Sequence, residues 1–152
     1  MGKVLYIMRG PSGSGKSTWV RNHILDAHIV SADQFWLVMN ASGEPDYVFN
    51  ISRLAEAHQD CFCRFLDAVY SGVDYIAVDN TNIQKWQYAH YVKVAKREGY
   101  TVRIVEFRPE TVSDIKVCIK RNIHEVPSET VVKMCLSFEP EDEPYLTPPI
   151  SS

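Results

Sequence analysis

The fold is decided by the stretch Gly10-Pro11-Ser12-Gly13-Ser14-Gly15-Lys16-Ser17, which matches the pattern G-x-x-x-x-G-K-[ST]. An apolar run, Val4–Met8, precedes it and predicts a strand buried on both faces. A helical pattern from about Lys16 to His28 follows it. Glycines in such a turn let backbone N–H groups surround phosphate oxygens, and the helix N-terminus adds its positive dipole end. The stretch therefore predicts a phosphate-binding loop for a nucleoside triphosphate.

Two side chains of this loop have expected chemical roles. Lys16 is expected to reach the β- and γ-phosphates and to act in catalysis, and Ser17 is expected to ligate Mg²⁺. The remaining nucleotide-binding candidates of the loop are Gly10, Ser12, Gly13, Ser14, Gly15 and Thr18.

Beyond the loop, strand-like and helix-like segments alternate along the chain. Such alternation predicts an α/β fold, a P-loop NTPase three-layer sandwich whose parallel sheet of four or five strands has helices on both faces. The expected later strands are 29–31, 75–79 and 102–107, and the expected later helices are 50–71, 86–95, 112–122 and 128–138. The longest loop, Asn40–Phe49, follows the second strand and is expected beside the site, since ligands bind beyond the carboxyl ends of parallel strands.

The length of 152 residues suits one domain, which we expect to span residues 1–138. Residues 139–152 form an acidic, Pro-rich tail with a charge of −4, expected to be flexible or to bind a protein partner. The body carries only +1, so composition gives no sign of a duplex-binding surface. No apolar run approaches the roughly 18 residues of a membrane span, and the N-terminus resembles no targeting signal, so a cytoplasmic location without membrane contact is expected.

Two carboxylates follow predicted strands and should share an edge of the sheet with the phosphate loop. Asp33 comes after the second strand, where it could accept the proton of a hydroxyl that attacks the γ-phosphate. It could equally be the N-cap of a helix over Gln34–Met39. Asp79 ends the third strand after an apolar run and is expected to hold Mg²⁺ directly or through water.

Other polar residues near the predicted site have two interpretations each. Asn80 and Asn82 could contact substrate or orient Asp79, or could simply form a turn. Lys120 and Arg121 end a predicted helix just before a break at Ile123–Pro127. They could form a lid that brings positive charge over the transferred phosphate, or could favour the helix C-terminus as cations do.

The combination of these motifs resembles the kinase domain of polynucleotide 5′-hydroxyl kinases and of small P-loop kinases related to them. The resemblance covers roughly residues 3–138 and depends on the order of the phosphate loop, Ser31-Ala32-Asp33, Asp79-Asn80-Thr81-Asn82 and Lys120-Arg121-Asn122. It implies that the nucleotide is ATP, that Asp33 is the general base, and that Lys120 and Arg121 belong to the lid.

The acceptor half departs from that family. The Arg that these kinases carry shortly after the base is Trp36 here, and their further lid Arg is replaced by Ile123-His124-Glu125. Trp36 and Phe35 could stack on a base of the acceptor, or could roof the pocket.

We therefore expect a Mg²⁺-dependent phosphotransferase that moves the γ-phosphate of ATP to a hydroxyl of a nucleic acid or nucleotide. The resemblance favours a polynucleotide 5′-hydroxyl as the acceptor. A hydroxylated modified base in DNA and a small metabolite are alternative acceptors. A different class of function is an ATP-gated binding module without catalysis.

Overall fold

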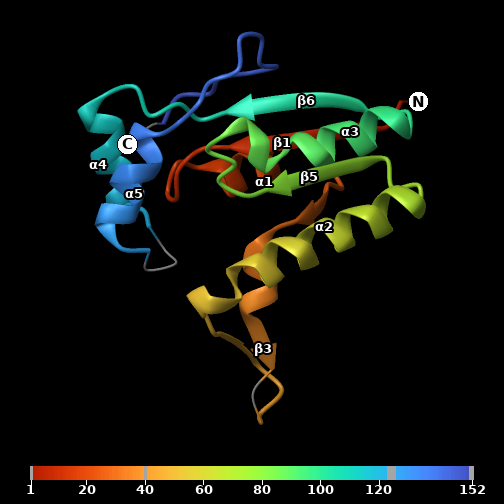
Figure 1. Ribbon diagram of the computed structural model, residues 1–152, viewed down its shortest axis with the longest axis horizontal. Coiled ribbons are helices and arrows are strands. Elements are labelled where there is room, and N and C mark those ends of the chain that lie inside the picture. The colour runs from red at the N-terminus through yellow and green to blue at the C-terminus, as the bar shows by residue number, and fades with distance from the viewer. Residues whose placement is uncertain (1, 40, 123–125, 151–152) are drawn as a thin grey trace.

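The computed structural model describes residues 2–39, 41–122 and 126–150. Its main sheet has the strand order β2-β5-β1-β6, and every neighbouring pair is parallel (Figure 1). These strands are β1 (Val4–Arg9), β2 (His28–Val30), β5 (Tyr75–Asp79) and β6 (Thr101–Glu106). Parallel neighbours need crossover connections, which helices supply here. The expected α/β fold with a parallel sheet of four or five strands is confirmed.

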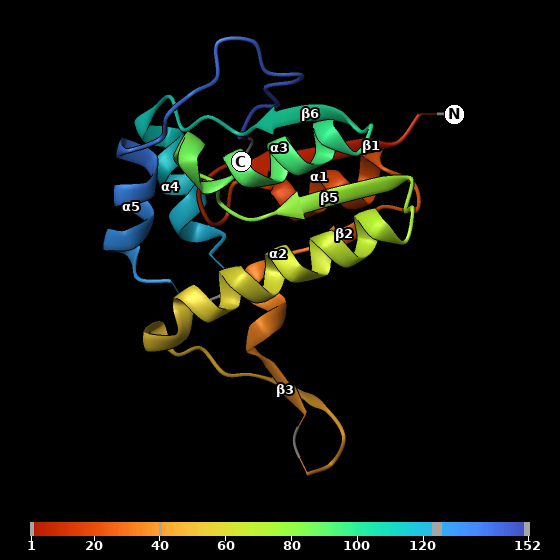
Figure 2. The ribbon, with the colours of Figure 1, turned by 45° about the vertical axis from the view of Figure 1, so that its right-hand side comes forward.

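Helices cover both faces of the sheet. They are α1 (Lys16–His23), α2 (Leu54–Tyr70), α3 (Ala89–Arg97), α4 (Val112–Lys120) and α5 (Ser128–Leu136). Successive side chains of a strand point to opposite faces, so Leu5 and Ile7 of β1 enter the core beneath α2 and α3, whereas Tyr6 and Met8 enter the core shared with α1, α4 and α5. Figure 2 shows α4 and α5 as a pair beside the carboxyl ends of β5 and β6.

The segment after β2 differs from the predicted loop. It forms a short 3-10 helix, η1 (Ala32–Trp36), and then an antiparallel hairpin of β3 (Leu37–Met39) and β4 (Pro45–Tyr47). The hairpin projects away from the main sheet (Figure 1). Gly43, with φ +78°, supplies the left-handed conformation that a tight turn needs. The single helix expected over Gln34–Met39 is therefore wrong, because η1 ends at Trp36 and β3 begins at Leu37. Asn40 lies outside the described residues.

Two more 3-10 turns precede helices. The turn η2 (Ile51–Arg53) leads into α2, and the Asn50 side chain accepts a hydrogen bond from the Ser52 N–H, so Asn50 caps the turn rather than α2 itself. The turn η3 (Lys85–Gln87) leads into α3. Within the described residues, no helix combines the length and the apolar character that a membrane crossing requires.

The composition of the tail predicts a flexible segment. In the structure, the tail instead packs against the body. The Tyr145 N–H donates to the Ile104 carbonyl at 2.8 Å, and the Glu106 N–H donates to the Leu146 carbonyl at 3.0 Å. Ile150 is buried in the core that contains α5. The edge of β6 offers unpaired backbone groups, and the tail satisfies some of them. Acidic residues and prolines dominate the composition of the tail and concealed these few apolar anchors.

Candidate active site

The phosphate loop connects the end of β1 to the start of α1, as the sequence predicts. Gly13 sits in it with φ +81°, and a Cβ at this position would lie 2.2 Å from the carbonyl oxygen of Cys118 in α4. Both the backbone conformation and the close approach of α4 therefore require glycine here. The helix α4 therefore packs directly against the loop.

The side chains of the loop fit a phosphate group. Lys16 is buried, and its ammonium donates to the carbonyls of Gly10 at 2.9 Å and Pro11 at 3.0 Å. Burial lowers the pKa of Lys16, and the carboxylates of Asp79 and Asp33 partly oppose that shift. The hydroxyl of Ser14 is buried without a hydrogen-bond partner among the described residues. A buried hydroxyl with no partner is costly, and a phosphate oxygen would satisfy it.

Ser17 and Asp79 meet at the start of α1. The Ser17 hydroxyl donates to Asp79 Oδ2 at 2.5 Å, although the residues are 62 positions apart in the chain. Within the described residues, no group of three or more His, Cys, Asp or Glu side chains could hold a metal ion. Magnesium bound with nucleotide phosphates typically takes only one or two protein carboxylates, so this pair fits such an ion.

Of the two remaining hydroxyls of the predicted set, Ser12 lies in the loop and Thr18 lies in the first turn of α1. Ser12 approaches Met134 of α5, with 3.9 Å between Oγ and Sδ, and Thr18 accepts a hydrogen bond from Arg21 at 3.2 Å. Ser12 therefore adds a contact between the loop and α5, beside the contact of Gly13 with α4.

Asp33 lies on η1, with its side chain exposed. The interpretation of Asp33 as an N-cap is wrong, because Ser31 caps η1 in a capping box with Gln34. The Asp33 carboxylate accepts a hydrogen bond from the Tyr47 hydroxyl at 3.3 Å. Its charge also contributes to the pKa of Lys16, opposing the effect of burial.

Asn80 and Asn82 hold the turn after β5. Asn80 accepts from the Ala32 N–H at 2.8 Å, and its amide reaches Cys61 Sγ at 3.5 Å. Asn82 is buried with φ +45° and donates to the Met8 carbonyl at 2.9 Å. These contacts fit the turn interpretation of both residues. Asn80 also ties the end of β5 to η1, which carries Asp33.

Trp36 is 3% exposed, and its ring packs edge-on against Phe35 and Phe49, with centroids 5.1 and 4.9 Å away. A ring buried in this way has no free face for a base, so the stacking role expected of Trp36 does not fit its position. Phe35 is partly buried, and the Arg53 guanidinium lies 4.8 Å from its centroid. Both aromatic residues pack in or against the core beneath α2.

Lys120 and Arg121 lie at the C-terminal end of α4, both exposed. A methyl group added at Gly15 would lie 3.9 Å from Nη1 of Arg121, so this guanidinium is next to the phosphate loop. The position agrees with the lid interpretation of Arg121. Residues 123–125, which the sequence places in the expected lid, lie outside the described residues.

One buried network behind the loop was missed by sequence reasoning. Arg9, the last residue of β1, forms an ion pair with Glu106 at the end of β6, and neither side chain is exposed. Its guanidinium also donates to the Asn82 carbonyl at 2.7 Å and the Glu139 carbonyl at 2.7 Å. The network joins the strand that leads into the phosphate loop to the Asp79 turn and to the tail. The signal in the sequence was a charged residue at the end of each of two predicted strands.

The fold and the site together define a P-loop kinase-like α/β domain. Residues 5–140 match the family described as an AAA domain, and the chain belongs to that family. The chain is also 32% identical over 148 residues to human NEDD4-binding protein 2. The match covers 91% of this chain and 8% of that protein. The chain therefore spans a small part of that protein.

Two solved structures share the fold at low identity. An APS kinase, CysC of Mycobacterium tuberculosis in complex with AMPPNP and APS, has a TM-score of 0.60 and 15% identity over 97% of this chain and 88% of its own. A gluconokinase from Sinorhizobium meliloti 1021 has a TM-score of 0.59 and 14% identity over 99% of this chain and 83% of its own.

Proposed function

We propose that this domain is a Mg²⁺-dependent kinase that transfers the γ-phosphate of ATP to a hydroxyl group. The observation that carries the proposal is the position of Asp33, an exposed carboxylate on η1. The Ala32 N–H beside it donates to Asn80 at 2.8 Å, which ties η1 to the end of β5, where Asp79 contacts Ser17 of the phosphate loop. A base on the same edge of the sheet as the phosphate loop is what in-line transfer to a hydroxyl requires.

Each residue of the site has a defined task in this proposal. Lys16, the Ser14 hydroxyl and the backbone N–H groups of the loop bind the phosphates, and Arg121 brings positive charge from the lid. Ser17 and Asp79 would hold Mg²⁺, which supplies charge neutralisation at the phosphates. Asp33 accepts the proton of the acceptor hydroxyl as its oxygen bonds to the γ-phosphorus, and the bond to the ADP oxygen breaks.

For the acceptor we propose a hydroxyl of a nucleic acid or nucleotide, with a polynucleotide 5′-hydroxyl first. The motif order Asp33 and Asp79-Asn80-Thr81-Asn82 supports this choice. A small metabolite is the second candidate acceptor. The two fold neighbours named above are an APS kinase and a gluconokinase, and this chain matches most of the length of each. Because Trp36 is buried, neither proposal includes stacking of an acceptor base on its ring.

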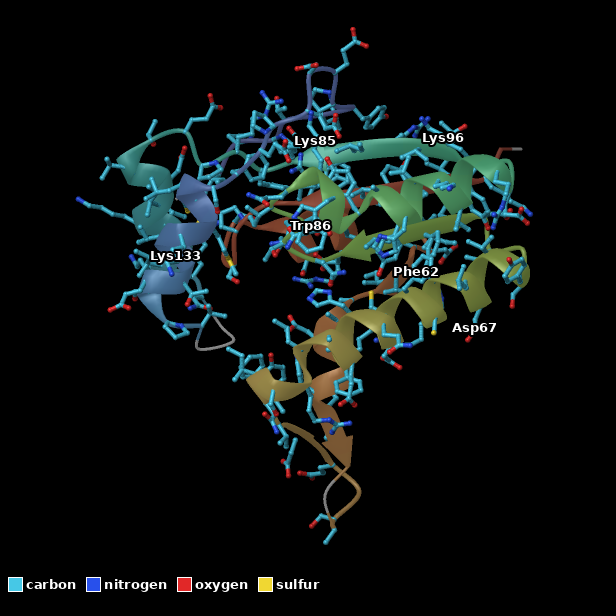
Figure 3. All side chains as sticks on the ribbon, in the orientation of Figure 1. Phe62, Asp67, Lys85, Trp86, Lys96 and Lys133 are labelled. Carbon is cyan, nitrogen blue, oxygen red and sulfur yellow. The ribbon has the colours of Figure 1, made fainter. Side chains whose placement is uncertain are left out.

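The test is transfer of labelled γ-phosphate to a panel of 5′-hydroxyl DNA and RNA oligomers, DNA with hydroxymethylated bases, nucleosides and sugars. Asp33→Asn should lower transfer by about 10²–10⁴-fold while ATP affinity stays unchanged. The matched control is Asp67→Asn, an exposed residue near the far end of α2 (Figure 3). Equal transfer by wild type and Asp33→Asn would remove Asp33 as the base. Bound ATP with no labelled acceptor would favour the binding module.

A further inference from the structure

Tyr47 is the last residue of β4, and its hydroxyl contacts the carboxylate that we propose as the base. The hydroxyl donates to Asp33 Oδ1 at 3.3 Å. Burial, with a further contribution from the Asp33 charge, raises the pKa of Tyr47 to about 12. The phenol is therefore protonated at neutral pH and acts as a hydrogen-bond donor.

Two further contacts join the hairpin segment to η1. The Val48 N–H, one residue after Tyr47, donates to the Trp36 carbonyl at 2.7 Å. Phe49 packs on the ring of Trp36, which is buried in the core beneath α2. Trp36 ends the same 3-10 helix that carries Asp33. The phenol and the carboxylate therefore belong to two segments that share one buried anchor.

We propose that Tyr47 is a positioning residue that orients the Asp33 carboxylate toward the acceptor hydroxyl, an inference that rests on the proposed kinase function. An exposed carboxylate rotates readily, and a donor on one of its oxygens restricts that rotation. An ionised carboxylate has about four acceptor sites, so the Tyr47 hydrogen bond and one from the acceptor can exist together. Tyr47 transfers no proton itself.

The β3–β4 hairpin gains a function from this assignment. It lies outside the main sheet, and its strands pair Leu37 with Tyr47 and Met39 with Pro45. That pairing sets which residue of β4 stands next to η1. The hairpin thus acts as a support that brings one phenol to the acceptor side of the site.

The test compares Tyr47→Phe with Tyr70→Phe, a control at the end of α2 whose side chain is 68% exposed. The probes are Mg–ATP and a 5′-hydroxyl oligodeoxynucleotide, or whichever panel member is labelled. Tyr47→Phe keeps the ring and removes its hydrogen bond to the Asp33 carboxylate, so kcat should fall about tenfold while KM for ATP stays unchanged. Tyr70→Phe should match wild type.

A double-mutant cycle separates positioning from a merely structural role. Tyr47→Phe should add nothing to the loss caused by Asp33→Asn, since its effect acts through that carboxylate. Wild-type kcat in Tyr47→Phe, or an equal further loss in the Asp33→Asn background, overturns the inference and leaves the kinase proposal standing. Transfer that does not depend on Asp33, or to no acceptor, overturns the kinase proposal and the inference with it.

Discussion

In the proposed site, the phosphate loop has buried side chains, whereas the acceptor side carries exposed ones on the hairpin. Ser14 and Lys16 are buried beside β1, in a loop that α4 covers. Tyr47 is 39% exposed and Phe49 is 54% exposed, on a segment outside the main sheet. Backbone groups and glycines build the first half, whereas side chains of a hairpin and η1 build the second. The acceptor half can therefore change without disturbing the phosphate loop.

A matched pair of glycine substitutions tests this contrast most strongly. Gly13→Ala places a methyl group 2.2 Å from the Cys118 carbonyl, so the loop or α4 must shift. We expect ATP affinity to fall by at least about a hundredfold, a loss of roughly 2.7 kcal/mol, measured by calorimetry. Gly43→Ala in the hairpin has the same sign of φ but meets no atom within 4 Å.

The control should therefore show only the strain of a left-handed residue, about 1–2 kcal/mol of stability, with unchanged ATP affinity. Wild-type affinity in Gly13→Ala would show that α4 yields easily to the loop. Reduced ATP affinity in Gly43→Ala would show that the two halves are coupled.

The second prediction concerns stability in the acceptor half. Trp36→Ala removes a buried ring and should lower the free energy of unfolding by about 3–5 kcal/mol. Phe49→Ala removes a neighbouring ring that is mostly in water and should cost roughly 1 kcal/mol. Urea unfolding of both variants gives the comparison. Similar costs for the two would mean that Trp36 is less buried than its contacts indicate.

Sequence reasoning succeeded where the signal is local. The phosphate loop, the strand that ends at Asp79 and the helix ends near Arg121 each depend on neighbours in the chain, and their positions agree with expectation. Sequence reasoning failed for the environment of Trp36. Its burial depends on α2 and Phe49, which belong to later segments of the chain. Residue propensities also could not predict the Tyr47–Asp33 contact, because it depends on the register between the short strands β3 and β4.

The tail shows the same limit in a different way. Its charge and prolines predict a solvated segment, yet Tyr145, Leu146 and Ile150 attach it to β6 and the core. Three anchors in a polar segment cannot be recognised without the edge that receives them. The composition is an average over the whole tail, so it does not identify the three apolar residues that pack.

The third prediction tests the metal pair in the nucleotide half. Ser17→Ala should weaken ATP binding about tenfold in MgCl₂, a loss of roughly 1.4 kcal/mol, because the hydroxyl is an expected ligand. In EDTA the variant and wild type should bind ATP equally, which makes the chelated sample the internal control. Calorimetry in both buffers measures the difference. A loss of the same size in EDTA would mean that Ser17 supports the loop through Asp79 rather than through magnesium.

The smallest effect is expected for a substitution at Tyr88. This substitution tests whether the tail is attached to the nucleotide half of the site. Tyr88 is buried, its ring lies 4.6 Å from the Arg9 guanidinium, and its hydroxyl donates to Glu141 of the tail at 2.6 Å. Tyr88→Phe removes that hydrogen bond and keeps the ring, so stability should fall by about 1 kcal/mol, or roughly 3 °C in Tm. Tyr70→Phe should leave Tm unchanged. A tail that moves freely in solution would make the two variants equal, whereas a lower Tm in Tyr88→Phe alone ties the tail to the network behind the phosphate loop.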